Sequence, residues 1–295
     1  MGAVERDVTS NHGIRYFIRD DDVGDLTDGL KVFAETFALL RIPVSYQIIP
    51  SKLTARCANF LLSIYRDYPG LVEFGQHGLN HEMILKGRAV KREFGPERSF
   101  LEQSEDIRKG LDVLRSHLGS QCTISVFTPP QHKYDGNTVR AAVASGHKIF
   151  SAAYYASFRH QAAYALGQRL GIGSFHHYGI SYHNAFRPEA DILEVSISVA
   201  VDDGQVIRTE SRRLLKSLTA ASAHSKVVGL MFHHKMYESV RDRSELKNSA
   251  KLLARLGSAH FCRLTAIAQA GSKELTAAKH TISGSPIRKE GPSSN

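Results

Sequence analysis

The stretch Ile14–Asp22, IRYFIRDDD, decides the fold of this chain. Its apolar residues Ile14, Tyr16 and Ile18 occupy every second position, and this alternation is typical of a β-strand. The strand runs directly into three consecutive carboxylates. We therefore expect a first strand that ends in acidic residues, at the C-terminal edge of a parallel sheet.

The residues after this strand predict a β-α-β unit. Asp28 can cap a helix with apolar residues at helical spacing, and Pro43–Ile49 has the pattern of a second strand. Further strands are predicted at Leu71–Phe74, Thr123–Phe127, Lys148–Ala152, Ile192–Val199 and Val227–Phe232, and further helices after Ser51, at 99–118, at Asn137–Ser145, and near 208–222 and 242–256. Repeated alternation of this kind predicts an α/β fold, with a mostly parallel sheet that forms a closed or nearly closed barrel inside a layer of helices.

One barrel domain, residues 13–270, accounts for all of these elements. Residues 1–12 are expected to form an N-terminal extension. The segment 271–295 is rich in Ser, Gly, Lys and Pro, so we expect a disordered basic tail.

Composition narrows the class of protein. The chain has 38 Lys+Arg against 29 Asp+Glu, but 10 basic and 4 acidic side chains lie in 241–295, so the excess charge is largely C-terminal. No basic stretch is interleaved with aromatic residues, and we expect no nucleic-acid partner. The 3 cysteines are far apart and odd in number, which argues against a disulfide scaffold. Since neither a signal-peptide core nor an apolar run of membrane length is found, we expect a cytoplasmic protein without a membrane span.

Polar residues gather just after the predicted strand ends. Asp20–Asp22, His77, Pro129–Pro130 and His233–His234 each follow a strand. The C-terminal rim of the strands holds the active site in α/β barrels. These residues, scattered over more than two hundred positions, should therefore converge on one mouth.

The segment from His77 to His81, HGLNH, sets two imidazoles four residues apart. On a helical turn or in a tight loop, both can reach one ion. One carboxylate of the Asp triplet would complete a set of three protein ligands, which leaves an open position as in catalytic zinc sites. With 15 histidines in the chain, a chance surface pair is the alternative.

The acidic triplet and the last strand suggest how protons would move. Crowded carboxylates are unfavourable unless a cation or hydrogen bonds offset their repulsion, although a solvated turn with a helix cap is the alternative. One carboxylate could bind the cation while its neighbour removes a proton from water. One of His233 and His234 should face the mouth and could protonate a departing amine, and the other would be a core histidine. A second histidine cluster at His176, His177 and His183 is expected on the surface or in a sugar-binding loop.

Four segments, taken in order, resemble the polysaccharide deacetylase superfamily, whose members share the NodB-homology fold and include carbohydrate esterase family 4. They are Arg19–Gly24, Gly75–His81, Phe127–Pro130 and Leu230–His234. The likeness spans roughly residues 13–260, and the sequence resembles a divergent branch. It implies a distorted (β/α) barrel with fewer than eight units, for which we expect seven strands.

The resemblance also implies roles for individual residues. The metal ligands would be Asp22, His77 and His81, the catalytic base Asp21 and the catalytic acid His233. Asp20 is left without a role. The cofactor would be a divalent metal, with zinc expected first and cobalt, nickel or manganese as alternatives. We expect Pro129, Pro130 and His234 to contribute to substrate binding.

Two departures from the family pattern stand out. Thr128 occupies the place of an arginine that usually pairs with the catalytic aspartate, so a different partner must position Asp21. The chain also contains no Trp, so the aromatic wall common near the fourth motif is absent.

The expected function is the metal-dependent removal of an acetyl group from an N-acetylated sugar or glycan precursor. One alternative is a metal hydrolase that cleaves another amide or a glycosidic bond, since barrel folds host many reactions. The other is a non-catalytic carbohydrate-binding protein on the same scaffold.

Overall fold

The fold is that of a computed structural model, which describes residues 13–270 apart from 86, 91, 154–161, 163–165, 167–184, 188–191 and 224. The predicted N-terminal extension, the predicted tail and the cluster of His176, His177 and His183 lie outside the described residues. None of the helices in the described part of the chain combines the length and the apolar character needed to cross a bilayer.

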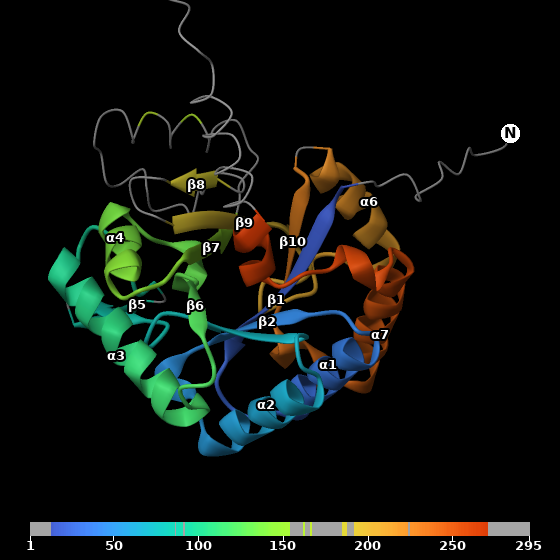
Figure 1. The fold of residues 1–295 in the computed structure, drawn as a ribbon, viewed down its shortest axis with the longest axis horizontal. Coiled ribbons are helices and arrows are strands. Elements are labelled where there is room, and N and C mark those ends of the chain that lie inside the picture. Colours follow the sequence, from blue (N-terminus) through green and yellow to red (C-terminus); the bar gives the residue numbers. More distant parts are fainter. Residues whose placement is uncertain are drawn as a thin grey trace, which may run out of the picture.

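A closed barrel of parallel strands forms the centre of the molecule (Figure 1). Its strands are β1 (Arg15–Val23), β2 (Val44–Ile48), β3 (Val72–Gln76), β6 (Ile124–Phe127), β7 (Ile149–Ala153), β9 (Ile192–Ala200) and β10 (Val227–Phe232). In the described residues, these seven strands pair in the order β10-β1-β2-β3-β6-β7-β9, and β9 pairs back to β10. The predicted distorted, seven-stranded (β/α) barrel is confirmed.

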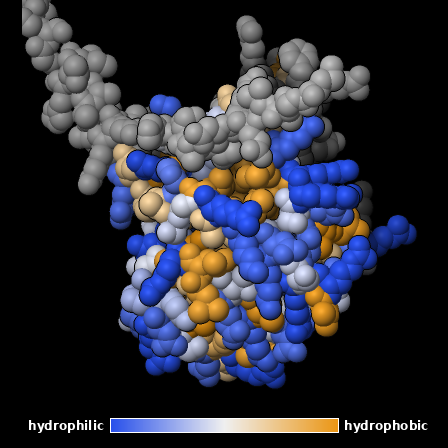
Figure 2. Space-filling view, turned by 90° about the vertical axis from the view of Figure 1, so that its right-hand side faces the viewer, coloured by the Kyte–Doolittle hydropathy of each residue, from blue (hydrophilic) through white to orange (hydrophobic). Residues whose placement is uncertain are grey.

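Helices surround the barrel, and Figure 1 shows α1, α2, α3 and α7 along its outside. The helices include α1 (Asp28–Leu39), α2 (Ala55–Asp67), α3 (Phe100–Leu118), α4 (Gly136–Ala144), α6 (Ser211–Ser222) and α7 (Val240–Arg255). Short 3-10 turns lie at η2 (Pro50–Lys52), η3 (Pro130–His132), η5 (His234–Tyr237) and η6 (Ser258–His260). Figure 2 shows hydrophilic and apolar groups interspersed on the side of the molecule that carries α6 and α7.

Capping residues explain where the helices begin. The predicted capping box of α3 is present, since Ser99 Oγ accepts from Glu102 N at 3.3 Å and the Glu102 carboxylate accepts from Ser99 N at 2.7 Å. For α1 the predicted cap is wrong by one residue. Thr27 accepts the hydrogen bond from Leu30 N, because a β-conformation precedes Asp28, which is already the first helical residue.

Two antiparallel pairings, one of them a separate two-stranded sheet, were not predicted from the sequence. A hairpin joins β4 (Met83–Leu85) to β5 (Arg88–Val90), and β8 (Ala185–Arg187) pairs with the start of β9. The strands β4, β5 and β8 have three residues each, which is too short for an alternating pattern to predict them.

The two faces of β1 enter different parts of the core. Tyr16 and Ile18 point outward and belong to the cluster that packs under α1, whereas Phe17 points into the barrel with Val126 and Ile197. This alternation is what the period of two in a strand requires. It also assigns Arg19 and Asp21 to the inner face.

A bulge interrupts the alternation at the end of β1. The register with β2 shifts between Asp20 and Val23, and Asp22 has a φ of 65°. The strand therefore contains the acidic triplet instead of ending before it. Because a bulge turns an extra side chain toward the same side, both Asp21 and Asp22 reach the mouth of the barrel.

Candidate active site

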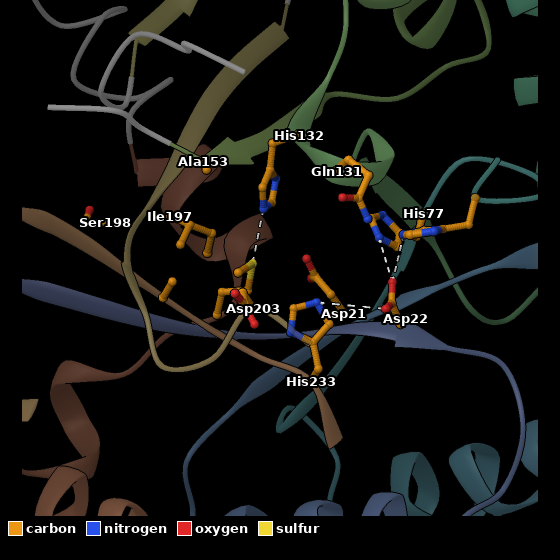
Figure 3. Close-up of a pocket in the computed structure, with 13 residues that line it drawn as sticks. Asp21, Asp22, His77, Gln131, His132, Ala153, Ile197, Ser198, Asp203 and His233 are labelled. Carbon is orange, nitrogen blue, oxygen red and sulfur yellow. Dashed lines mark hydrogen bonds and ion pairs between the residues drawn. The ribbon is translucent and has the colours of Figure 1, made fainter. Parts of the chain in front are cut away.

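A cavity of about 300 Å³ opens at the C-terminal ends of the strands (Figure 3). The polar residues that line it include Asp21, Asp22, His77, His81, His132 and His233. These residues come from four separate parts of the chain. Of the residues predicted to converge on one mouth, Asp21, Asp22, His77 and His233 line this cavity, whereas Asp20, Pro129, Pro130 and His234 do not.

Asp22, His77 and His81 bring one ligand atom each to a common point. Asp22 Oδ1 lies 2.9 Å from His81 Nε2 and 3.3 Å from His77 Nε2, and all three atoms lie within 4.8 Å of one another. Asp22 Oδ1 is buried and has no hydrogen-bond partner among the described residues. An orphaned carboxylate oxygen between two imidazole nitrogens is costly in the absence of a cation.

The tautomer of His77 strengthens this interpretation. Its Nδ1 lies 3.0 Å from the carbonyl oxygen of Thr128, which can only accept, so Nδ1 donates. A neutral His77 then presents the lone pair of Nε2 to Asp22, as metal-binding histidines do. Burial lowers the pKa of His81 and outweighs the opposing contact with Asp22, which favours the uncharged ring that a metal ligand needs. The donor set therefore fits a divalent metal such as zinc.

The second oxygen of Asp22 has its own partner. Lys235 Nζ donates to Asp22 Oδ2 at 2.5 Å, which leaves Oδ1 as the oxygen that faces the two imidazoles. The ammonium group of Lys235 favours the ionised form of Asp22, which is the form that a metal ligand must have.

Glu93 shapes the loop between the two histidines. The buried Glu93 carboxylate accepts hydrogen bonds from the backbone N–H groups of Leu79 at 2.7 Å, Asn80 at 3.2 Å and His81 at 2.8 Å. Burial raises the pKa of Glu93 to about 7 against the lowering effect of these bonds. Gly78 has a φ of 64°, and a Cβ there would collide with Glu93, so only glycine fits the turn.

Arg19 is the partner of Asp21. Its Nε donates to Asp21 Oδ1 at 2.7 Å and its Nη2 donates to Asp21 Oδ2 at 2.9 Å, and both side chains are buried. Burial raises the pKa of Asp21, but the Arg19 guanidinium leads the charges that lower it below the ordinary value. Nη1 of Arg19 is held by the carbonyl at 3.0 Å and the hydroxyl at 2.7 Å of Ser151. Thr128, for which the resemblance implies an arginine in other proteins, donates to Gln47 Oε1 at 2.8 Å.

Asp202 orients His233. Oδ1 of Asp202 lies 2.6 Å from His233 Nδ1, while its Oδ2 accepts from His233 N at 3.0 Å and from Tyr237 Oη at 3.3 Å. Burial lowers the pKa of His233, but the hydrogen bond to Asp202 and the charges of Asp21 and Asp22 raise it to about 9. His233 is therefore a protonated group at the mouth near neutral pH.

The third carboxylate of the triplet faces away from the cavity. Asp20 Oδ1 accepts from His234 N at 2.8 Å, and Asp20 Oδ2 lies 3.0 Å from His234 Nδ1. Both side chains are buried, and burial raises the pKa of Asp20 despite the opposing effect of His234. This pair connects β1 to η5.

The residues predicted to bind substrate occupy different places. His234 is buried against Asp20, and Pro130 is buried at the start of η3. The next two residues, Gln131 and His132, line the cavity. Direct substrate contact by Pro129, Pro130 and His234 stays a prediction.

Sequence reasoning missed Arg19, Asp202 and Glu93. The position of Arg19 could have been predicted, because a residue two before Asp21 lies on the same face of the strand. The position of Asp202 could also have been predicted, since this residue follows the predicted strand Ile192–Val199 at the same rim of the barrel. Glu93 lies beyond the hairpin, and no pattern connects it to the histidine loop.

The chain matches no protein-family model and no curated protein. Solved structures do share its fold. A presumed polysaccharide deacetylase from Mycobacterium smegmatis has a TM-score of 0.57 at 12% identity, with 90% of this chain and 81% of that chain covered. The Xyl-CE4 domain of a multidomain xylanase, from the hindgut metagenome of Trinervitermes trinervoides, has a TM-score of 0.51 at 7% identity, with 88% and 92% covered.

A CE4 family pseudoenzyme from Bacillus anthracis has a TM-score of 0.51 at 10% identity, with 88% of this chain and 66% of that chain covered. At such low identities the likeness establishes the fold alone. The expected resemblance to polysaccharide deacetylases is confirmed at that level. Because a pseudoenzyme shares the fold, the fold alone does not decide whether this chain is an enzyme, and its chemistry depends on its own residues.

Proposed function

We propose that this protein is a metal-dependent deacetylase that removes the acetyl group from an N-acetylated sugar or glycan precursor. The observation that carries the proposal is the convergence of Asp22 Oδ1, His77 Nε2 and His81 Nε2 beside Asp21 and His233. These five residues supply a cation site, a carboxylate and a protonated imidazole in one cavity, which suits amide hydrolysis by a metal-activated water with a base and an acid.

Asp22, His77 and His81 would hold the metal, with zinc as the first choice. Bound there, a divalent ion would polarise the acyl carbonyl and lower the pKa of a water molecule. Lys235 and Glu93 keep two of the three ligands in place, through Asp22 Oδ2 and the backbone of His81.

Asp21 would act as the base. Arg19 keeps it ionised and fixes the direction of both carboxylate oxygens, so it can accept a proton from the attacking water. A base with a depressed pKa is weak, and its contribution depends on its position rather than on its affinity for the proton.

His233 would act as the acid. Asp202 holds the ring through Nδ1, which leaves the Nε2–H of the imidazolium directed into the cavity. Transfer of this proton to the amine nitrogen allows the C–N bond to break. The free amine and acetate are then the products.

A glycan precursor is the substrate class we favour, for two reasons. The proteins that share the fold include a presumed polysaccharide deacetylase and a domain of a xylanase. The cavity also combines its polar residues with an apolar side formed by Ala153, Ile197 and Met231, which suits the mixed surface of an N-acetylated sugar.

Acetate release from purified protein tests the proposal. Protein incubated with Zn²⁺ or Co²⁺ should release acetate from at least one member of a panel of N-acetyl sugars and oligosaccharides, and it should bind one ion per chain. His77→Ala and Asp22→Ala should lose both the ion and the activity. Asp28→Ala, at an exposed acid of α1, is the matched control and should keep both.

Three other results would change or contradict the proposal. Metal binding with cleavage of a different amide or a glycosidic bond would keep the site but change the substrate. Unchanged metal content in His77→Ala and Asp22→Ala would contradict the assigned site. Sugar binding without any turnover would favour the non-catalytic alternative, for which the pseudoenzyme that shares the fold is a precedent.

A further inference from the structure

His132 enters the cavity from a strained backbone. Gln131 and His132 are consecutive non-glycine residues with φ values of 56° and 54°, and both line the cavity. Such conformations cost free energy and persist where the surroundings enforce them, often at functional sites. Figure 3 shows the His132 ring extending into the cavity.

Arg19 determines which ring nitrogen of His132 carries the proton. Nη2 of Arg19 lies 3.4 Å from His132 Nδ1. A guanidinium has only donors, so Nδ1 must accept. A neutral ring with an accepting Nδ1 carries its hydrogen on Nε2.

The charges around His132 favour this neutral form. Burial and the adjacent Arg19 lower the pKa of His132 to about 3, against the opposing effect of Asp21. A second positive charge beside the guanidinium would be unfavourable. The ring is therefore uncharged across the neutral range.

Among the residues that the structure describes, the Nε2–H group has only a weak partner. It lies 3.2 Å from Sδ of Met231, which also lines the cavity. A thioether sulfur is a poor acceptor, and a methionine side chain moves aside easily. An oxygen atom of a bound molecule would be the better acceptor.

We propose that His132 is a specificity-determining residue, which donates a hydrogen bond from Nε2 to an oxygen of the substrate beside Asp21. This inference rests on the proposed function and deepens it. The oxygen would be a hydroxyl, ether or carbonyl oxygen of the sugar substrate. Arg19 then has two roles, since its guanidinium orients the base Asp21 and also sets the tautomer of His132, which contacts the substrate.

Steady-state kinetics of His132→Gly provide the first test, with the best substrate from the acetate panel. Loss of a neutral hydrogen bond should raise KM by roughly 3- to 10-fold. We expect kcat to stay within about twofold, because Arg19 keeps its four bonds to Asp21 and Ser151. Thermal stability should not fall, because glycine relieves the positive φ. An unchanged KM, or a clear loss of stability, would show that His132 is structural.

Arg41→Gly is the matched control. Arg41 is an exposed residue after α1 with a φ of 57°, so its replacement relieves the same kind of strain away from the cavity. This variant should leave KM unchanged. A rise in KM for both variants would mean that relief of strain, not loss of the imidazole, causes the effect.

The tautomer can be measured without any turnover. ¹⁵N NMR of protein with labelled histidine should show a neutral ring at pH 7 that is protonated on Nε2, and this signal should vanish in His132→Gly. A ring protonated on Nδ1 or on both nitrogens would overturn the inference even if acetate is released. The expected tautomer in a protein that releases no acetate would instead contradict the proposed function.

Discussion

Arg19 and Asp21 are two residues apart on β1, so the strand turns both side chains into the barrel. The guanidinium meets the carboxylate with two parallel hydrogen bonds inside a buried site. A bidentate pair of this kind fixes the orientation of the carboxylate and also favours its charged form. The base is therefore supported from its own strand, and Thr128 is free to bond with Gln47.

Arg19→Lys should separate the charge of this residue from its geometry. Lysine keeps the positive charge but cannot make the paired contact. We expect kcat to fall by roughly 10- to 100-fold, because the base loses its fixed position. The pKa of Asp21 should rise, so the acidic limb of the kcat profile should move to higher pH. A profile between pH 4 and 8 that matches the unaltered protein would contradict this role.

Asp202→Asn should change the basic side of the same profile. The unaltered protein should lose activity as pH rises through about 9, where His233 loses its proton. Asp202 is the leading cause that raises the pKa of His233, so its removal should move this limb to lower pH. At pH 7, kcat/KM should fall by roughly 100-fold or more, as for other oriented histidines. The measurement is kcat/KM between pH 6 and 10, and a limb that stays in place would argue against His233 as the acid.

At the scale of elements, the loop from Gly78 to His81 owes its shape to a single buried carboxylate. Glu93→Gln would replace one acceptor of this loop with an amide N–H group. We expect zinc affinity to fall by roughly 10- to 100-fold, as for other residues that orient metal ligands. Competition with a chromophoric chelator measures this change.

Glu97→Gln is a suitable control for this prediction. Glu97 belongs to the same segment but is half-exposed and pairs with Arg92. Its replacement should change zinc affinity by less than about twofold, since surface ion pairs contribute little. Equal losses in both variants would mean that general loosening of the segment, not the hydrogen bonds of Glu93, lowers the affinity.

Local patterns predicted much of the fold and part of the site. Alternation and helical spacing located the barrel strands and their helices, and strand ends located Asp22, His77 and His233. The bulge at Asp22 could not be predicted, because it depends on how β1 pairs with β2. The same holds for Glu93, whose partners are backbone groups 12 to 14 residues earlier. Contacts between segments that no periodicity connects had to come from the tertiary structure.

At the scale of the whole molecule, the proposed metal site connects β1 to the loop after β3. An ion that binds only the folded state should stabilise the protein by about 2.7 kcal/mol at a concentration 100 times its Kd. For a domain of this size, the melting temperature should rise by roughly 5 to 11 °C. Thermal melts with Zn²⁺ and with a chelator test this, and Asp22→Asn should show no zinc-dependent shift. An equal shift in that variant would locate the stabilising ion elsewhere.

The bulged end of β1 has a consequence for how activity would be lost on heating. Arg19, Asp21 and Asp22 all lie on one strand, which is paired on both sides, with β10 and with β2. A strand enclosed in this way has no free edge from which to fray. The strand that carries the acidic half of the site should therefore be as long-lived as the barrel itself, and the backbone amides of its doubly paired part, from Ile18 to Asp20, should be among the last to exchange with deuterium. Partial unfolding could disorder the loop from Gly78 to His81, but only unfolding of the whole barrel would separate Asp21 from Arg19.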